Sequence, residues 1–389
     1  MYSMRLIITS FLVSLLLTGL PKTGNEYSGV QFQKEVEFGT NNEIIVGDVT
    51  ALSVDAKGQV FIADGTQTTI HIFSPDGTYI QSMGREGKGP GEFSSITFNT
   101  SIEIHQDKLF ITDTQTFFPH RAHVFSLQDF SFVYTLKLLA ENRGDYEELK
   151  GHYPKRVIPQ KDGTFLVSYH KTPHQYKDST SYIKYYVQDI SGKIVSGPIF
   201  KQKDRTNLTY LVRDEYPYIA IHSFPFFGKT ILDISEDEYL YALKSKEFKI
   251  DIYDSNGSYL RSIEHKFENR IFSKSKVLDR YKETDYGYNL GDGVALKMIE
   301  QADNLPKSWP AIDHMFIDDE NRIWVSTIVD NDEVYEWWIL DNSGELIHKF
   351  EWPRNQPIQT VRNNKLYTIE ENPKTFEKEV VQYQILMNE

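Results

Sequence analysis

Histidine is the side chain in this sequence best suited to bind a metal ion or to transfer a proton at neutral pH. Six histidines lie in or near segments that enter or leave the strands predicted below: His120, His152, His170, His174, His222 and His314. Metal ligands need not be close in sequence, so distant segments could together supply a divalent-metal site. The chain has no His-x-His or His-Glu-x-x-His spacing, however, and the sequence therefore favours no metal.

Nucleophiles and acid–base pairs are not marked by any motif either. The chain has no cysteine, which excludes thiolate chemistry and disulfides, and it has no Gly-x-Ser-x-Gly sequence that would present a catalytic serine. The adjacent carboxylates Glu147-Glu148 and Asp318-Asp319 are typical of solvated turns. The sequence leaves open whether two carboxylates from distant segments form the acid–base pair of a glycosidase, because their separation depends on the fold.

The segment Gly84–Gly91 has the glycine density of a phosphate-binding loop. No helix-forming run follows it and no Lys-Ser/Thr pair ends it, which excludes a P-loop and a dinucleotide-binding fingerprint. We interpret the segment as a tight connection between strands, and it places Arg85 and Lys88 on the face that carries such connections.

Composition indicates a soluble globular protein. Of the 389 residues, 40% are hydrophobic and 25% are charged, so the chain can bury a substantial core. The formal charge is -13, and no run of Lys or Arg is interleaved with aromatic residues. Nucleic acid is therefore not an expected partner.

Residues 1–20 have the features of a signal peptide. A charged start, Met1–Arg5, precedes an apolar run, Leu6–Leu17, that is too short to span a bilayer. The end of this segment resembles a lipoprotein processing box in which Leu20 replaces the cysteine, so the chain as given cannot be lipidated there. We expect an exported protein, periplasmic, secreted or at the cell surface, without a transmembrane segment.

Strand–turn–strand repeats organise the rest of the chain. In the clearest unit, β-rich segments alternate with Gly- and Asp-containing turns: Ala51–Asp55, Gln59–Asp64, Thr69–Phe73 and Thr78–Met83. The second segment has five counterparts: Lys108–Asp113, Thr164–Ser168, Tyr239–Leu243, Arg322–Ser326 and Lys365–Ile369. The sequence therefore predicts six units, each a four-stranded antiparallel meander.

The second strand of each unit is predicted to be buried on both faces. Val60 and Ile62 point one way and Phe61 and Ala63 the other, so both faces are apolar. The short turns exclude the crossover helices of a parallel sheet. An all-β ring of stacked antiparallel sheets satisfies both conditions, and we predict a single six-bladed β-propeller over residues 30–389.

The last unit and two long interruptions break the repeat. The last unit shows only three strands, and we predict that the alternating segment Gln31–Phe38 supplies the fourth and closes the ring. Residues 201–223 and 268–309 are predicted insertions on either side of blade four, the second with helix-compatible runs at Ser273–Lys282 and Gly293–Ala302. Long loops in a compact domain are more often functional than decorative.

The first unit carries a family resemblance. Phe61–Asp64, Ile72–Gly77 and Met83–Phe93 resemble NHL-repeat propellers, in particular the six-bladed propeller proteins that Bacteroides-type bacteria export. The match is clear over residues 49–98 and holds in outline elsewhere. The resemblance implies an exported propeller whose relatives include lactonases, an amidating lyase and pure binding scaffolds. None of their catalytic signatures matches positions of this chain.

Cofactor predictions follow from the same resemblance. Asp64 and Asp113 recur at the ends of second strands, and a repeated position favours a structural role in which the carboxylate accepts N–H groups of the next loop. Lactonase-like propellers hold a cation on the channel axis, so the resemblance leaves calcium there as the alternative to no cofactor.

The function that we predict is binding of a ligand or partner, such as a small molecule, glycan, peptide or protein, on the face that carries the inter-blade loops. Aromatic residues and arginines in the insertions, among them Arg270 and Arg280, are typical of recognition surfaces. Our candidate binding residues are Arg85, Arg121, His152, Arg213, Tyr216, Tyr218, His222, Trp309 and His314. The alternatives are a metal-dependent enzyme of the lactonase or lyase kind that uses the central channel, and a structural subunit of a surface assembly.

Overall fold

Aspartate-capped turns set the ends of the strands. The Asp55 carboxylate accepts hydrogen bonds from the N–H groups of Lys57 and Gln59, at 2.9 and 2.8 Å, and so fixes the turn after the first strand of blade one. Gly58 occupies this turn with a φ of 79°, a conformation that favours glycine. The computed structural model describes residues 29–39, 44–114, 118–171, 181–204, 206–212, 218–283, 293–372 and 377–387. The predicted signal peptide, residues 1–20, lies outside them.

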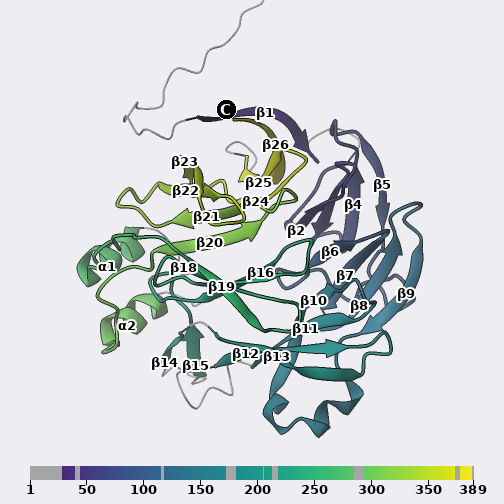
Figure 1. The fold of residues 1–389 in the computed structure, drawn as a ribbon, viewed down its shortest axis with the longest axis horizontal. Coiled ribbons are helices and arrows are strands. Elements are labelled where there is room, and N and C mark those ends of the chain that lie inside the picture. The colour runs from purple at the N-terminus through teal and green to yellow at the C-terminus, as the bar shows by residue number, and fades with distance from the viewer. Residues whose placement is uncertain are drawn as a thin grey trace, which may run out of the picture.

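Twenty-four of the described strands form six four-stranded antiparallel sheets, the blades of a ring (Figure 1). Blade one comprises β2 (Val49–Val54), β3 (Val60–Asp64), β4 (Thr69–Phe73) and β5 (Tyr79–Met83). Blade two comprises β6 (Ile102–His105), β7 (Lys108–Thr114), β8 (Pro119–Ser126) and β9 (Phe132–Lys137). Blade three comprises β10 (His152–Pro159), β11 (Phe165–Lys171), β12 (Tyr182–Gln188) and β13 (Ile194–Lys203). Blade four comprises β16 (Thr230–Ile234), β17 (Leu240–Lys244), β18 (Lys249–Tyr253) and β19 (Tyr259–Glu264). Blade five comprises β20 (Ile312–Ile317), β21 (Ile323–Thr327), β22 (Val334–Leu340) and β23 (Leu346–Pro353). The predicted all-β six-bladed propeller is confirmed.

The sixth blade joins the two ends of the chain. It is built from β24 (Ile358–Arg362), β25 (Lys365–Glu371) and β26 (Lys378–Met387), and its outer strand is β1 (Val30–Phe38). β1 runs antiparallel to β26 from the pair Val30/Met387 to the pair Phe38/Val380. The ring is closed by the N-terminal strand that the sequence predicts for this place.

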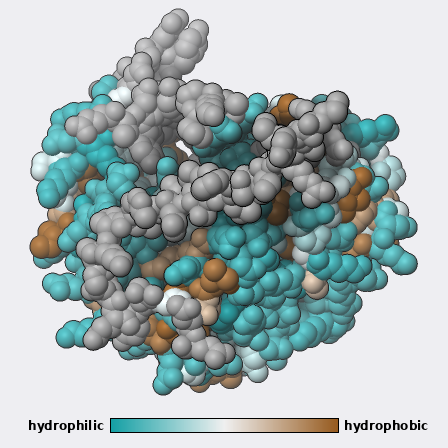
Figure 2. All heavy atoms as spheres, turned by 90° about the horizontal axis from the view of Figure 1, so that it is seen from above, coloured by the Kyte–Doolittle hydropathy of each residue, from teal (hydrophilic) through white to brown (hydrophobic). Residues whose placement is uncertain are grey.

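The core lies between the blades rather than inside any one of them. All five residues of β3 are buried, and the buried apolar residues form one cluster at each of the six blade–blade interfaces. The interface between blades three and four has the smallest of these clusters, with Leu166, Leu232 and Leu240 among its few members. The rim of the ring seen in Figure 2 is mostly hydrophilic, because the outer strands turn alternate side chains to solvent.

Two insertions flank blade four and share a core of their own. The first contains the hairpin β14 (Leu208–Val212) and β15 (Tyr218–His222), and the second contains α1 (Lys274–Glu283) and α2 (Val294–Gln301). Side chains from both gather around Phe224 and Phe226, whose rings stack 5.1 Å apart, with Met298 and Ile299 from α2. Figure 1 shows the helices at the periphery of the ring, beside blades four and five.

Removal of the Phe38 side chain tests the closing strand. Phe38 is fully buried, and its ring lies 5.8 Å from that of Phe73 in blade one and 6.5 Å from that of Tyr367 in blade six. We expect Phe38→Ala to lower the free energy of unfolding by about 3–5 kcal/mol, because it opens a cavity at the closure. Urea unfolding measures this change. Gln33→Ala, an exposed position of the same strand, is the control, and an equal effect of the two substitutions would contradict a stabilising closure.

Candidate ligand-binding site

One face of the ring carries both the connections between blades and those between the second and third strands of each blade; we call it the loop face. Asp64, at the end of β3, holds two of these connections together. Its carboxylate accepts N–H groups of Gly47, at 2.7 Å, from the preceding loop and of Thr66, at 2.8 Å, from the following one. It also lies 3.4 Å from the ring of His71. Asp64 therefore has the structural role that its repeated position predicts.

Asp113 repeats this arrangement in blade two. Its buried carboxylate accepts the Ser94 N–H at 2.8 Å and forms an ion pair with Arg121 Nε at 2.7 Å. Burial would raise the pKa of Asp113, but contacts with His123 and Arg121 outweigh it and hold the pKa below its usual value. Arg121 is thus engaged in the scaffold of the loop face.

The glycine-rich segment after β5 is a folded connection. The Phe93 N–H donates to the Arg85 carbonyl at 2.9 Å, and the Gly87 N–H donates to the Phe93 carbonyl at 2.9 Å. The Arg85 guanidinium projects to solvent and pairs with Glu92 at 2.7 Å. The connection predicted from the sequence is therefore what the chain forms.

Asp318 differs from its predicted setting. Its carboxylate is buried and accepts hydrogen bonds from the Arg322 N–H at 2.8 Å and from the Trp324 indole N–H at 2.7 Å. The interpretation of Asp318 as a solvated turn residue is wrong. Its carboxylate stabilises the turn after β20 and also accepts the hydrogen bond of a buried indole N–H group.

The central channel carries a chain of charges that the sequence analysis missed. Arg156 Nε donates to Glu103 at 2.7 Å, and an Arg156 Nη atom lies 3.6 Å from Asp233, whose other oxygen accepts the Ile317 N–H at 2.8 Å. These contacts link blades two, three, four and five. Glu103 raises the pKa of Arg156, and burial raises the pKa of Asp233.

Four further candidate residues come from three different strands. His152 is buried at the start of β10, where burial lowers its pKa, and His314 lies on β20, its ring 6.5 Å from that of Trp337. Tyr218 is half exposed at the start of β15, and His222 packs against Phe224 at the end of that strand. Arg213 and Tyr216 lie outside the described residues, as does His174.

A cavity lies on the loop face beside the helical insertion. Its volume is about 1100 Å³, and it is bounded by the insertion, by the loop after β21 and by the end of β23. We call it the arginine cavity. Among its lining residues are Arg270, Arg280, Trp309, Asp330, Asp332, Tyr335 and Arg354.

Three arginines of this cavity meet at one carboxylate. Asp332 accepts both terminal nitrogens of Arg270, the second at 3.2 Å, and lies 3.1 Å from Arg280 and 3.7 Å from Arg354. Asp330 adds a solvent-facing carboxylate 3.7 Å from Arg270 Nε. Around Asp332, three guanidinium groups thus face two carboxylates. Over the whole lining, the three arginines and Lys276 face five carboxylates, Glu268, Asp313, Asp330, Asp332 and Glu333, so the positive charge is local to the arginine cluster.

The aromatic side chains and the charges hold these groups in place. The guanidinium carbon of Arg354 lies 4.4 Å over the ring of Tyr335, and that of Arg270 lies 5.6 Å from the ring centre of Trp309. The hydrogen bond from Arg270 lowers the pKa of Asp332, so this carboxylate is ionised at neutral pH. Burial lowers the pKa of Arg354, yet a guanidinium keeps its proton in proteins. The site therefore presents oriented N–H donors to a cavity.

Sequence reasoning found about half of this site. Arg270, Arg280 and Trp309 were singled out because they lie in an insertion, and the structure brings them together in the arginine cavity. Asp332, Tyr335 and Arg354 were missed because they come from ordinary blade-five positions with no local motif.

Two further features were sought in the described part of the chain: a cluster of metal ligands and a membrane-spanning helix. Within it, no three His, Cys, Asp or Glu side chains gather in a way that could hold a metal ion. None of the described helices is both long enough and apolar enough to cross a membrane.

Substitution of Asp64 tests the anchoring of the loop face. Burial would raise the pKa of Asp64, but hydrogen bonds from His71 and from backbone N–H groups outweigh it and hold the pKa at about 2. The carboxylate therefore contributes about 2 kcal/mol above pH ~4, and this contribution is lost as the pH falls toward 2. We expect Asp64→Asn to destabilise by about this amount at pH 7 and by progressively less between pH 4 and 2.

Urea unfolding across that pH range measures the effect. Glu86→Gln, an exposed carboxylate in the next loop, is the control and should change stability by less than about 0.5 kcal/mol. A difference between Asp64→Asn and the unchanged protein that does not vary with pH would contradict this account.

Comparisons with known proteins agree with this architecture. Residues 30–215 match a family, DUF5128, described as a 6-bladed beta-propeller. A solved structure from Bacteroides fragilis, described as an exported protein, shares 13% identity with this chain and has a TM-score of 0.52, covering 95% of this chain and 98% of its own. A DUF4221-family member from Bacteroides vulgatus shares 11% identity with a TM-score of 0.51, covering 93% and 100%. No curated protein matches the sequence. The chain is a six-bladed β-propeller that resembles propeller proteins of Bacteroides.

Proposed function

We propose that this protein is an exported binding module whose ligand, an anion, occupies the arginine cavity on the loop face. The observation that carries the proposal is the convergence of Arg270, Arg280 and Arg354 on the single carboxylate of Asp332. Guanidinium groups bind carboxylate, sulfate and phosphate through paired hydrogen bonds, and they do so most strongly where water is partly excluded.

The roles of the three arginines differ. Arg270 is committed to Asp332 through two hydrogen bonds and fixes the carboxylate at the centre. Arg280, on α1, contacts Asp332 through one terminal nitrogen, and Arg354 donates Nε to the Val334 carbonyl at 2.8 Å. We assign ligand contact above all to Arg280, because its side chain is 37% exposed, against 18% for Arg354 and 16% for Arg270.

Export is the second part of the proposal. Its support is the signal-peptide pattern of residues 1–20 and the likeness to a Bacteroides protein described as exported. A binding module with no cysteine forms no disulfide, so its folding does not depend on the redox state of the compartment.

Calorimetric titration with small anions tests the binding site. We expect glucuronate, sulfate or phosphate to bind the purified protein, and neutral glucose to bind at least tenfold more weakly. Arg280→Ala should weaken anion binding about tenfold or more, because it removes a charge-assisted hydrogen bond worth about 1.5–3 kcal/mol.

The control is Lys150→Ala, which removes the same charge from an exposed position elsewhere on the loop face. Its anion affinity should stay within about twofold of that of the unchanged protein. Equal affinities of Arg280→Ala and Lys150→Ala, or no binding of any of the three anions, would contradict the proposed function.

A further inference from the structure

A second hollow lies next to the arginine cavity on the loop face. Its volume is about 370 Å³, and it lies between the end of β13, the loop that precedes β16 and the loop that follows β17. We call it the lysine hollow, because its lining includes five lysines: Lys201, Lys203, Lys229, Lys244 and Lys246. The lining also includes three carboxylates: Asp204, Glu247 and Asp251. It therefore carries two formal positive charges at neutral pH.

The two hollows share a wall. The Asn269 amide, on the arginine cavity, donates hydrogen bonds of 2.9 Å to the carbonyl of Lys246 in the lysine hollow and to the carbonyl of Trp309 in the arginine cavity. Beside it, Lys229 of the lysine hollow lies 3.5 Å from Asp313 of the arginine cavity. One contact thus joins the hollows through the backbone and the other joins them through an ion pair.

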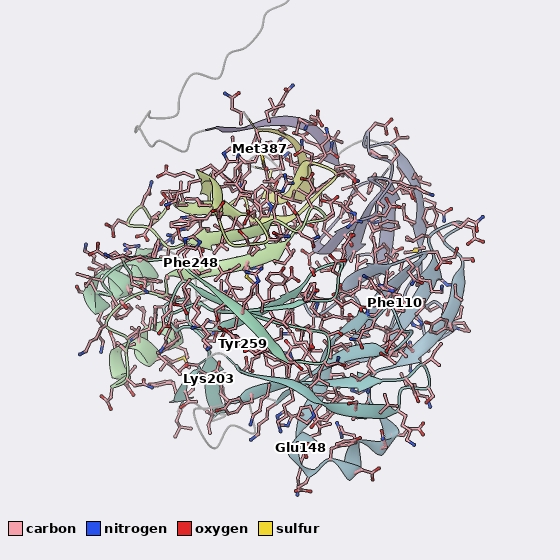
Figure 3. All side chains as sticks on the ribbon, viewed as in Figure 1. Phe110, Glu148, Lys203, Phe248, Tyr259 and Met387 are labelled. Carbon is pink, nitrogen blue, oxygen red and sulfur yellow. The ribbon has the colours of Figure 1, made fainter. Side chains whose placement is uncertain are left out.

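The first insertion and the blade interface with the smallest apolar cluster meet at the lysine hollow. The lysine hollow lies over the interface between blades three and four, which has the smallest apolar cluster of the six. Lys203, labelled in Figure 3, ends β13 on the side of the ring that carries the insertion hairpin. Among the described residues, neither Lys203 nor Lys246 forms an ion pair, and both are exposed.

The lining of the arginine cavity indicates a ligand that carries hydrogen-bond donors as well as negative charge. Besides its arginines it contains carboxylates such as Glu268 and Glu333. An ionised carboxylate only accepts hydrogen bonds, so a ligand that fits this lining must bring donors as well as negative charge. Hydroxyl groups supply such donors. An acidic peptide offers few donors beyond its backbone, and an ionised polyphosphate chain offers almost none, because its oxygens are acceptors.

We propose that the arginine cavity and the lysine hollow are subsites for one acidic oligosaccharide, a chain of hydroxyl-bearing sugar units with at least two carboxylates. This inference rests on the proposed function, because it takes the arginine cavity as the first subsite. A ligand that reaches both hollows gains affinity over a single unit, because its second contact is intramolecular. Lys203 and Lys246 are then specificity-determining residues for ligand length.

Titration with probes of matched chemistry tests the two-subsite model. The probes are galacturonate, tetragalacturonate, neutral maltotetraose and a tetraglutamate peptide, each added to the full-length protein. We expect tetragalacturonate to bind at least about tenfold more tightly than galacturonate. We also expect it to bind at least tenfold more tightly than maltotetraose or tetraglutamate.

Two double variants separate the subsites from general charge effects. Lys203→Ala with Lys246→Ala should reduce the tetragalacturonate affinity to within about twofold of the galacturonate affinity, while galacturonate binding itself is unchanged. Lys57→Ala with Lys193→Ala removes the same charge from exposed turns on the opposite face, and should change either affinity by less than about twofold.

The failing outcomes are distinguishable. Equal binding of galacturonate and tetragalacturonate would overturn the second subsite and leave the arginine cavity as an anion site. Equal binding of tetraglutamate or maltotetraose would overturn the acidic sugar as the ligand class. Absence of binding by galacturonate, sulfate and phosphate alike would overturn the proposed function and this inference together.

Discussion

The pairing of β1 with β26 is the interaction on which the rest of the structure depends. Each blade is apolar on both faces, so it is buried only when a neighbour lies on either side. A ring meets this condition for all six blades at once, and an open stack would leave two faces in water. The first and last described strands lie in one sheet, and the eight paired residues from Val30 to Phe38 join the two ends of the ring.

Closure also decides where function can lie. Because the faces of the blades pack against one another, the side chains of the loop face are available for binding. The buried carboxylates Asp64 and Asp113 accept hydrogen bonds from the loops and so hold these connections on the strands. The insertions need no blade for their apolar contacts because they form a cluster of their own around Phe226. They can therefore line a cavity beside blade five without disturbing the ring.

The sequence was informative where a pattern repeats and silent where the fold alone brings residues together. The alternation of Gln31–Phe38 and the missing strand of the last unit were enough to predict the closure, because register in a sheet follows a period of two. The arginine cavity was predicted only on its insertion side. Arg354 and Asp332 lie in short loops of a regular blade, 52 or more residues from Arg270 and Arg280, and only the return of the chain through blade five brings them together. The channel ion pairs of Arg156 were missed for the same reason.

The ion pairs of the arginine cavity are better suited to recognition than to stability. A partly exposed pair contributes little to folding, and an apolar surface would hold the insertion against blade five at lower cost. Three arginines around Asp332 nevertheless keep their guanidinium groups fixed before any ligand arrives, with Tyr335 and Trp309 packed beside two of them. The anion that we propose as ligand would then meet donors that are already oriented, so less conformational entropy would be lost on binding. Under this proposal, pre-orientation of the guanidinium groups is the role of the carboxylate at the centre of the arginine cavity.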